Sequence, residues 1–253
     1  MPTIVVPAAP PRPGLVLTGL AAEAPVSAVE AARLYKACFR DALSAADVAG
    51  GDLIVTYPSA DRVGTNEDGT GPEAAVRAAA TPALSAPAEV RFEVQVGSTP
   101  SARLGNVVTH LLREEEVSSV GYLLPSAYNT PRTVLDSAAM KSRSADLVLG
   151  PAPDGRVHYA AFADASLNFA DSLAPPALDG LAASAAEAEV ATDFVETRPL
   201  LERAADLPTL LATVSARRRA GRTVPERVAA VVDELGLRLE ADDDDDALRV
   251  VRD

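Results

Sequence analysis

The stretch PRPGLVLTGLA, Pro11–Ala21, decides the fold because of what lies on either side of it. Before it comes a short run of β-branched residues, Ile4–Val6. After it, Ser27 is followed three residues later by Glu30, a capping box that predicts the start of a long amphipathic helix, 27–47. A strand, a loop and a helix in this order are typical of the first unit of an open α/β sheet.

The loop that leaves the first strand of such a sheet opens onto the crevice where ligands bind. Here the loop is stiffened by Pro11 and Pro13, turned by Gly14, and carries a single hydroxyl, Thr18. Gly14 and Thr18 are therefore candidates for holding a phosphate. Apart from Arg12, the loop carries no positive charge.

The same stretch resembles the first motif of small bacterial and archaeal proteins of the glycosyltransferase-A-like, or nucleotide-diphospho-sugar transferase, superfamily. That motif reads roughly P-x-P-G-x-V-K-T-R-L-A. The positions that match in register are Pro11, Pro13, Gly14, Val16, Thr18, Leu20 and Ala21. The two basic positions differ, since Leu17 stands at the Lys and Gly19 at the Arg. The resemblance implies a divergent member of this superfamily that has kept the loop but lost its cations.

The composition is strongly acidic. The 253 residues include 36 Asp and Glu against 23 Lys and Arg, a net charge of −13, and only two of the bases are lysines, Lys36 and Lys141. An acidic surface with so little lysine is typical of proteins that stay dissolved in concentrated salt, where their self-repulsion is screened. The sequence therefore indicates a haloarchaeal-type protein. A GC-rich genome that favours Arg and Ala codons is the alternative.

The same charge argues against nucleic acid as a partner, because phosphates are bound through Lys and Arg. Cys38 is the single cysteine and cannot form an internal disulfide, which fits a reducing cytoplasm. No basic leader precedes the first strand, and no apolar run approaches the roughly 18 residues of a membrane span. We therefore expect a cytoplasmic protein without membrane contact.

Strand-like and helix-like runs alternate along most of the chain. Leu53–Tyr57 and Asp146–Gly150 are almost continuously apolar, as in strands buried on both faces of a parallel sheet. Ser119–Leu124 and Arg156–Phe162 are two further expected strands. Further helices are expected at 101–116, 175–189, 206–219 and 224–235, with one more beginning at Thr130-Pro131. This order predicts the α/β class: one doubly wound, mostly parallel sheet with helices on both faces.

No long Pro-, Gly- or Ser-rich linker interrupts this alternation. We therefore expect one domain, residues 1–238, followed by an acidic tail, residues 239–253. Val90–Val96 alternates apolar and polar residues, which is typical of a half-exposed strand. Such a strand at a sheet edge could pair between subunits, so a homo-oligomer is one open alternative.

A second part of the resemblance follows a buried strand. LGPAPDG, Leu149–Gly155, is similar to the family's L-G-P-x-x-D-G-G, with Arg156 at the second glycine. An Asp at the carboxyl end of a strand is well placed to bind a divalent ion, so Asp154 is the candidate metal ligand. The alternative is an Asp-Gly turn that only joins two strands.

The family's G-S-D-C-P-D-L-T-P motif is changed most. Aligned on Thr130-Pro131, its two aspartates fall on Pro125 and Tyr128, and the first of them supplies the family's metal-binding carboxylate. In a D-L-G-x-R segment, Arg103 stands at the Asp. The resemblance thus implies a cofactor, Mg²⁺ or Mn²⁺, whose site is degenerate here, and it leaves Arg103 or Arg156 to replace the missing cation.

Weaker signals lie outside these motifs. His158 is expected to pack in the sheet, and Glu202 falls on a family aspartate. Asp206, followed by Pro208, is expected to cap a helix, and Thr223 with Glu226 predicts another capping box.

Together these features indicate a transferase-like protein that takes a glycosyl or nucleotidyl group from a nucleotide donor. A nucleotide or nucleotide sugar is the expected partner. Its phosphate-binding candidates are Gly14, Thr18, Arg103 and Arg156. A non-catalytic descendant that binds a small ligand or a protein, and a structural subunit, stay open as alternatives.

Overall fold

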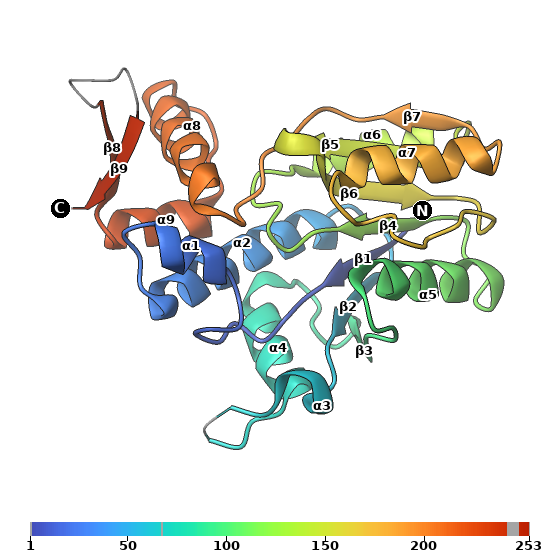
Figure 1. The fold of residues 1–253 in the computed structure, drawn as a ribbon, viewed down its shortest axis with the longest axis horizontal. Helices are drawn as coiled ribbons and strands as arrows, with labels where there is room; N and C mark the ends of the chain where they lie inside the picture. Colours follow the sequence, from blue (N-terminus) through green and yellow to red (C-terminus); the bar gives the residue numbers. More distant parts are fainter. Residues whose placement is uncertain (1, 67, 242–247, 253) are drawn as a thin grey trace.

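The computed structural model describes residues 2–66, 68–241 and 248–252, and a seven-stranded sheet forms its centre (Figure 1). The strand order is β3-β2-β1-β4-β6-β5-β7. The strands are β1 Thr3–Pro7, β2 Leu53–Tyr57, β3 Arg91–Val94, β4 Val120–Leu123, β5 Leu147–Ala152, β6 Arg156–Phe162 and β7 Thr192–Phe194. All neighbours pair in parallel except β6, which runs antiparallel to β4 and β5. The expected doubly wound, mostly parallel α/β sheet is confirmed.

The direction of β6 follows from a tight turn. Pro153–Gly155 reverses the chain directly after β5, with Asp154 and Gly155 both at positive φ, 62° and 68°. A two-stranded antiparallel hairpin needs only such a short connection. As a result Arg156, the first residue of β6, lies at the same edge of the sheet as the last residues of the parallel strands. We call this edge the carboxyl edge.

Helices cover both faces of the sheet. On one face, α5 (Pro100–Arg113) and α7 (Ala177–Glu187) pack on Val5, Ile54 and Leu147. The other face carries α2, α4 and α6 over a cluster that includes Ile4, Val55 and Tyr159. These three helices span Ala28–Asp47, Pro72–Ala80 and Arg132–Lys141. Successive strand residues enter opposite clusters, as the period of a strand requires.

Helix α2 begins as predicted. Ser27 Oγ accepts a hydrogen bond from the Glu30 N–H at 3.3 Å, and Glu30 Oε2 accepts one from the Ser27 N–H at 2.8 Å. The helix is buried on two sides, because Phe39 packs against the sheet while Leu34 and Cys38 face away from it. That second side is covered by α1, α8 and α9. Their bounds are Thr18–Glu23, Leu207–Arg219 and Glu226–Glu234.

The end of the chain differs from the expected tail. Residues Leu237–Ala241 and Leu248–Arg252 form an antiparallel hairpin, β8–β9, beside α8 (Figure 1). Leu237 is buried, and Leu239 and Val250 pack against the same apolar cluster, so alternating apolar residues hold the hairpin in place. The acidic run Asp242–Asp246 lies outside the described residues. We call α8, α9 and this hairpin the C-terminal layer.

Two smaller predictions concern segments at the surface. The capping box predicted at Thr223 and Glu226 is wrong: Pro225 is the N-cap residue of α9, and no side chain among the described residues caps that helix. The short segment Val90–Val96 does lie at a sheet edge, since β3 is the outermost strand, and Val94 and Val96 are 48% and 66% exposed. The remaining short helix, α3, spans Ala60–Val63. No helix in the described ranges combines the length and apolar character that a bilayer crossing requires.

Candidate functional site

The predicted phosphate loop lies at the carboxyl edge, directly after β1. Gly14 has φ +74°, which a side chain would strain, and it is exposed together with Thr18. Thr18 is the first residue of α1, and Leu17 before it is left-handed with φ 48°. The loop is anchored by Tyr35 Oη, which accepts a 2.8 Å hydrogen bond from the Ala9 N–H. The structure thus keeps Gly14 and Thr18 open to solvent on an anchored loop.

Cations that the sequence analysis missed lie beside this loop. Lys36 and Arg40, one turn apart on α2, line a cavity of about 340 Å³ together with Arg12. Arg12 is fixed by hydrogen bonds to the carbonyls of Val63 and Thr65, the latter at 2.7 Å. The i, i+4 spacing of Lys36 and Arg40 was the available signal, because it puts both on one side of a helix. The positive charge beside the loop therefore comes from Arg12 of the loop itself and from two residues of helix α2.

A second cavity, of about 310 Å³, contains Arg103. It lies between α5 and the ends of β2 and β3, with Thr56, Gln95, Asn106 and Tyr122 in its wall. Within the described part of the chain, the Arg103 guanidinium makes no hydrogen bond and no ion pair. Burial lowers the pKa of Arg103, and the nearby positive charge of Arg62 lowers it further. An unpaired, half-buried cation of this kind would gain from an anion in the cavity.

A third cavity, of about 280 Å³, shares one wall residue, Tyr122, with the second. Its walls are mostly apolar: Leu124, Val157, Leu173, Pro175, Pro176 and Leu200. Its polar end consists of Asp154, Arg156 and Glu202. A ligand that fits here has an apolar body and a polar group at one end.

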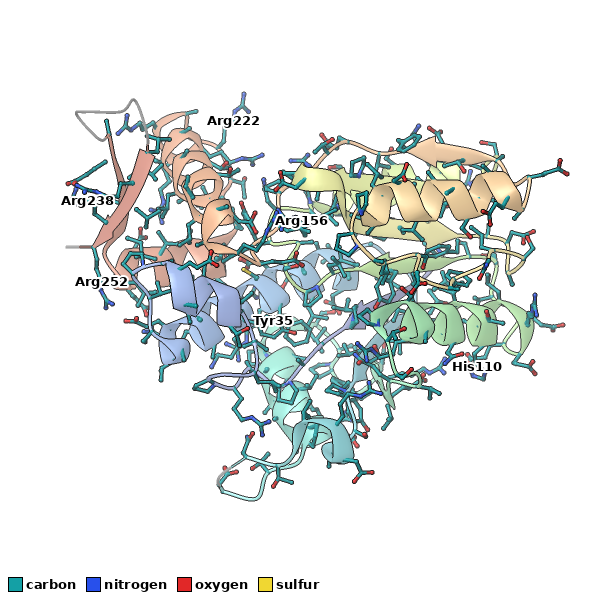
Figure 2. All side chains as sticks on the ribbon, in the orientation of Figure 1. Tyr35, His110, Arg156, Arg222, Arg238 and Arg252 are labelled. Atoms are coloured by element: carbon teal, nitrogen blue, oxygen red, sulfur yellow. The ribbon has the colours of Figure 1, made fainter. Side chains whose placement is uncertain are left out.

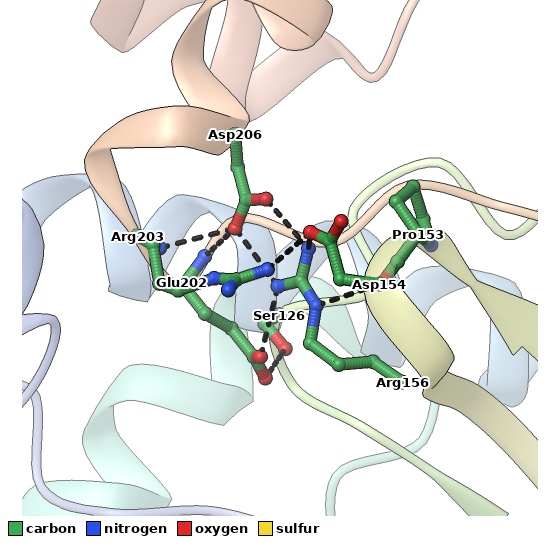
Figure 3. Close-up of polar contacts among 7 residues, drawn as sticks. All are labelled: Ser126, Pro153, Asp154, Arg156, Glu202, Arg203 and Asp206. Carbon is green, nitrogen blue, oxygen red and sulfur yellow. Dashed lines mark hydrogen bonds and ion pairs between the residues drawn. The ribbon is translucent and has the colours of Figure 1, made fainter. Parts of the chain in front are cut away.

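Arg156 is the centre of the most tightly bonded group at the carboxyl edge (Figure 3). Its Nη1 and Nη2 donate to the two carboxylate oxygens of Asp206 at 2.9 and 2.6 Å. Nη1 also donates to Glu202 Oε2 at 3.1 Å, and Asp154 Oδ2 lies 3.8 Å from Nη2. Asp154 in turn accepts from Arg203 Nη2 at 2.5 Å. We call these five residues the Arg156 cluster.

The Arg156 cluster joins distant parts of the chain. Asp154 and Arg156 come from the β5–β6 turn, whereas the other three members precede α8. Ser126, in the loop after β4, donates from Oγ to Glu202 Oε1 at 2.8 Å. Figure 2 shows Arg156 between the sheet and the C-terminal layer, while Arg222, Arg238 and Arg252 lie at the outside of that layer. The cluster is therefore one of several polar links between the two parts of the molecule, beside ion pairs such as Arg227–Asp41 and Arg252–Glu30.

In this cluster, hydrogen bonds shift the pKa values more than burial does. Burial would lower the pKa of Arg156, but its bonds to Asp206 and Glu202 raise that pKa overall. Burial would raise the pKa of Asp206, but bonds from Arg156 and from the backbone N–H groups of Glu202 and Arg203 lower it overall. Both groups therefore stay charged. Asp206 is the N-cap residue of α8, as expected, but its carboxylate makes no capping bond to α8 within the described residues and instead accepts from the turn that precedes that helix.

The donor set around Asp154 does not fit Mg²⁺ or Mn²⁺ as the chain stands. The nearest charged groups to this carboxylate are two guanidinium groups, from Arg156 and Arg203. Among residues 2–66, 68–241 and 248–252, no three His, Cys, Asp or Glu side chains are placed to hold a metal ion. A divalent ion needs several free oxygen ligands. The metal predicted at Asp154 stays a prediction, and a metal titration decides it.

His158 packs inside the sheet, as expected. It is fully buried, with Nδ1 3.1 Å from Thr130 Oγ1 and Nε2 3.2 Å from the Glu196 carbonyl. A carbonyl can only accept, so Nε2 carries the proton and Nδ1 accepts from the threonine. Gly150 provides the room, because a Cβ there would lie 2.5 Å from His158 Nε2. His158 is neutral and lines none of the three cavities at the carboxyl edge.

Solved structures share this architecture. A protein from Desulfovibrio desulfuricans G20, assigned as a nucleotide-diphospho-sugar transferase, superposes with a TM-score of 0.69 at 18% identity. The match covers 92% of this chain and 95% of that one. The fold is that of the nucleotide-diphospho-sugar transferases. At this identity the match establishes the fold alone.

Two further structures extend the comparison. The 4-diphosphocytidyl-2C-methyl-D-erythritol synthase of Anaerococcus prevotii has a TM-score of 0.51 at 10% identity, covering 85% of this chain and 96% of that one. Rv0371c of Mycobacterium tuberculosis, solved with manganese, has a TM-score of 0.44 at 16% identity over 83% and 97% of the two chains. The similarity to Rv0371c is too weak to support a metal site in this chain. No model of a known protein family matches the chain, and no curated protein matches its sequence.

Proposed function

We propose that the protein binds a nucleotide or nucleotide sugar at the carboxyl edge and transfers a glycosyl or nucleotidyl group to a second ligand. One observation carries the proposal: two cavities of about 310 and 280 Å³ share the wall residue Tyr122. A transferase must hold donor and acceptor side by side, because its rate depends on bringing the reacting groups into contact. A module that binds one ligand needs only one such cavity.

The donor is assigned to the cavity that contains Arg103. Its unpaired guanidinium suits a phosphate, and the amides of Gln95 and Asn106 can hydrogen-bond to a base or a sugar. Gly14 and Thr18, on the loop after β1, line none of the three cavities, and their role in binding phosphate stays a separate proposal. The acceptor is assigned to the second cavity, whose polar end is formed by the Arg156 cluster.

Calorimetry with nucleoside triphosphates and nucleotide sugars tests this assignment. Arg103→Ala removes a charge-assisted hydrogen bond worth about 1.5–3 kcal/mol, so binding should weaken roughly 10- to 100-fold. Arg113→Ala is the matched control, since it changes the same residue type at the other end of α5, where the side chain donates to the Ala165 carbonyl. Equal affinities in both variants would place the donor elsewhere.

The alternative is a non-catalytic descendant. It is favoured by the Arg156 cluster, in which each of the three carboxylates is paired with a guanidinium group and so none serves as a free acid or base. Phosphorus NMR at saturating nucleotide separates the two. Release of pyrophosphate or a nucleoside phosphate in the presence of a sugar or alcohol acceptor supports the transferase. Binding without turnover over the whole acceptor panel supports the binding module.

The proposal also covers the compartment and the salt concentration in which the protein works. The net charge of −13 and the two lysines support a haloarchaeal-type cytoplasm. In that case molar KCl should raise the melting temperature, because it screens the self-repulsion of the carboxylates.

A homo-oligomer through the β3 edge is proposed as well. Size-exclusion chromatography of the wild type and of Val94→Lys tests it, since a charge on the edge strand opposes pairing.

A further inference from the structure

The cavity between helices α2 and α4 is assigned to neither the donor nor the acceptor. It is the cavity of about 340 Å³ that Arg12, Lys36 and Arg40 line, and we call it the α2–α4 cavity. Among the described residues, it shares no wall residue with the two cavities assigned above. Its volume is within the range of sites for small ligands. Its ligand therefore has to be inferred from its own walls.

The three cations of the α2–α4 cavity are half-buried and have no carboxylate partner within the described part of the chain. Arg12 donates to two backbone carbonyls at and after the end of α3, and Arg40 Nε donates to the Ala79 carbonyl at 2.7 Å. Lys36 makes no hydrogen bond and no ion pair with the described residues. A carbonyl orients a guanidinium but carries no charge to neutralise it. The arginines are therefore held in place with their charge available to a ligand.

These positive charges repel one another unless an anion lies between them. Lys36 and Arg40 stand at i and i+4 of one helix, a spacing at which like charges destabilise the helix. Burial lowers the pKa of Arg40, and the nearby charge of Arg227 lowers it further. Asp68 is the single carboxylate among the described wall residues, so three cations and one carboxylate leave a net charge of +2. The whole chain, by contrast, has a net charge of −13.

The other walls of the cavity restrict what the anion is attached to. Helix α4 contributes only alanines, among them Ala74 and Ala78, so no long side chain from this helix fills the space. The loop before α4 contributes the amide of Asn66, the carboxylate of Asp68 and the hydroxyl of Thr70. Such groups exchange hydrogen bonds with hydroxyl groups. A ligand that uses all of these walls carries a phosphate and several hydroxyls.

We infer that the α2–α4 cavity is a further ligand site, which binds a small phosphate monoester that carries hydroxyl groups. The phosphate lies among Arg12, Lys36 and Arg40, and the hydroxyls face the loop before α4. A bound phosphate would join the loop after β1, through Arg12, to helix α2. The inference does not depend on the proposed function, because the two use different residues.

Calorimetric titration with ribose 5-phosphate tests the inference, with orthophosphate and ribose as partial ligands. It is run at the lowest KCl concentration at which circular dichroism shows the chain folded, because salt screens the attraction. The wild type should bind ribose 5-phosphate more tightly than orthophosphate and should not bind ribose. Lys36→Gln and Arg40→Gln should each weaken binding of ribose 5-phosphate roughly 10- to 100-fold, since each removes a charge-assisted hydrogen bond.

Three further variants serve as controls. Arg33→Gln changes a charge on the same helix outside the cavity, where Arg33 pairs with Glu234, and should leave the affinity unchanged. Asp68→Asn should tighten orthophosphate binding, because it removes a negative charge from the wall. Arg103→Ala should leave binding of ribose 5-phosphate unchanged, so a failure of the donor assignment does not affect this test.

The inference has clear contrary outcomes. Lys36 has no hydrogen-bond partner in the described part of the chain, so Lys36→Gln should stay folded. Unchanged affinity in folded Lys36→Gln and Arg40→Gln would overturn the inference. An equal loss in Arg33→Gln would do the same, because it would show general attraction to positive charge rather than a site. Absence of binding by the wild type at about 10 mM ribose 5-phosphate would also overturn it.

Discussion

Asp206→Ala tests how strongly the Arg156 cluster stabilises the fold. The Asp206 carboxylate accepts four hydrogen bonds: two from Arg156, at 2.6 and 2.9 Å, and two from backbone N–H groups, at 2.9 and 3.0 Å. Removing one partner of a buried ion pair costs about 3–5 kcal/mol, because the other charge stays buried. Arg156 keeps Glu202 and some solvent contact, so we expect the lower end, about 3 kcal/mol.

Urea unfolding followed by circular dichroism measures this loss. For a chain of this size about 3 kcal/mol lowers the melting temperature by roughly 6–12 °C. Asp136→Ala is the control, since Asp136 also pairs with an arginine, Arg132 at 3.2 Å, but is 44% exposed. We expect the control to lose less than about 0.5 kcal/mol, as surface pairs do.

A double-mutant cycle separates the ion pair from other effects of the alanine. Asp206→Ala and Arg156→Ala are each expected to destabilise, and the double variant to lose about 2 kcal/mol less than the sum. Losses that add within about 0.5 kcal/mol would refute the reasoning, because they would show that the two side chains do not stabilise each other.

Three further predictions concern residues that build the scaffold. Burial lowers the pKa of His158 from 6.5 to about 4, so the unfolded chain takes up a proton first as the pH falls. The free energy of unfolding should therefore drop by about 1.4 kcal/mol per pH unit between pH 6.5 and about 4. Unfolding of His158→Gln at several pH values should lack this component. Gly121→Ala puts a Cβ 2.3 Å from the buried, unbonded Tyr159 hydroxyl and should cost roughly 1–3 kcal/mol in urea unfolding, which adding Tyr159→Phe should relieve. Ser27→Ala removes the cap of α2 and should cost about 1 kcal/mol by the same measurement, whereas Ser27→Asp should not.

Local patterns predicted the elements of the fold. The apolar run Leu53–Tyr57 is strand β2, and the capping box at Ser27 begins α2. The pairing partners of β6 were not predictable in the same way. Arg156–Phe162 indicates a strand, but neither its antiparallel direction nor its place between β4 and β5 is written in its own residues. Both depend on the turn at Asp154 and on packing with distant segments.

The residues of the candidate site could be predicted only in part, because their contacts also join segments that lie far apart in the sequence. Asp154 and Arg156 stood out because a motif surrounds them, and the structure brings them together. Glu202 and Asp206 join them from about 50 positions further along the chain, and no spacing rule connects the two segments. Arg103 was a candidate from its motif, whereas Lys36 and Arg40 became informative only once the cavity around them was known.

The two-sided burial of α2 has a consequence for synthesis of the protein. When the ribosome has made the sheet strands β1 to β7, the outer side of this helix, with Leu34 and Cys38, still lacks its cover, which is encoded after residue 200. Helix α1 covers part of this side, but until the segment with α8 and α9 emerges, the nascent chain presents the rest of the apolar stripe to chaperones and to its neighbours. A premature stop codon near residue 200 should therefore yield an aggregating product rather than a smaller working domain.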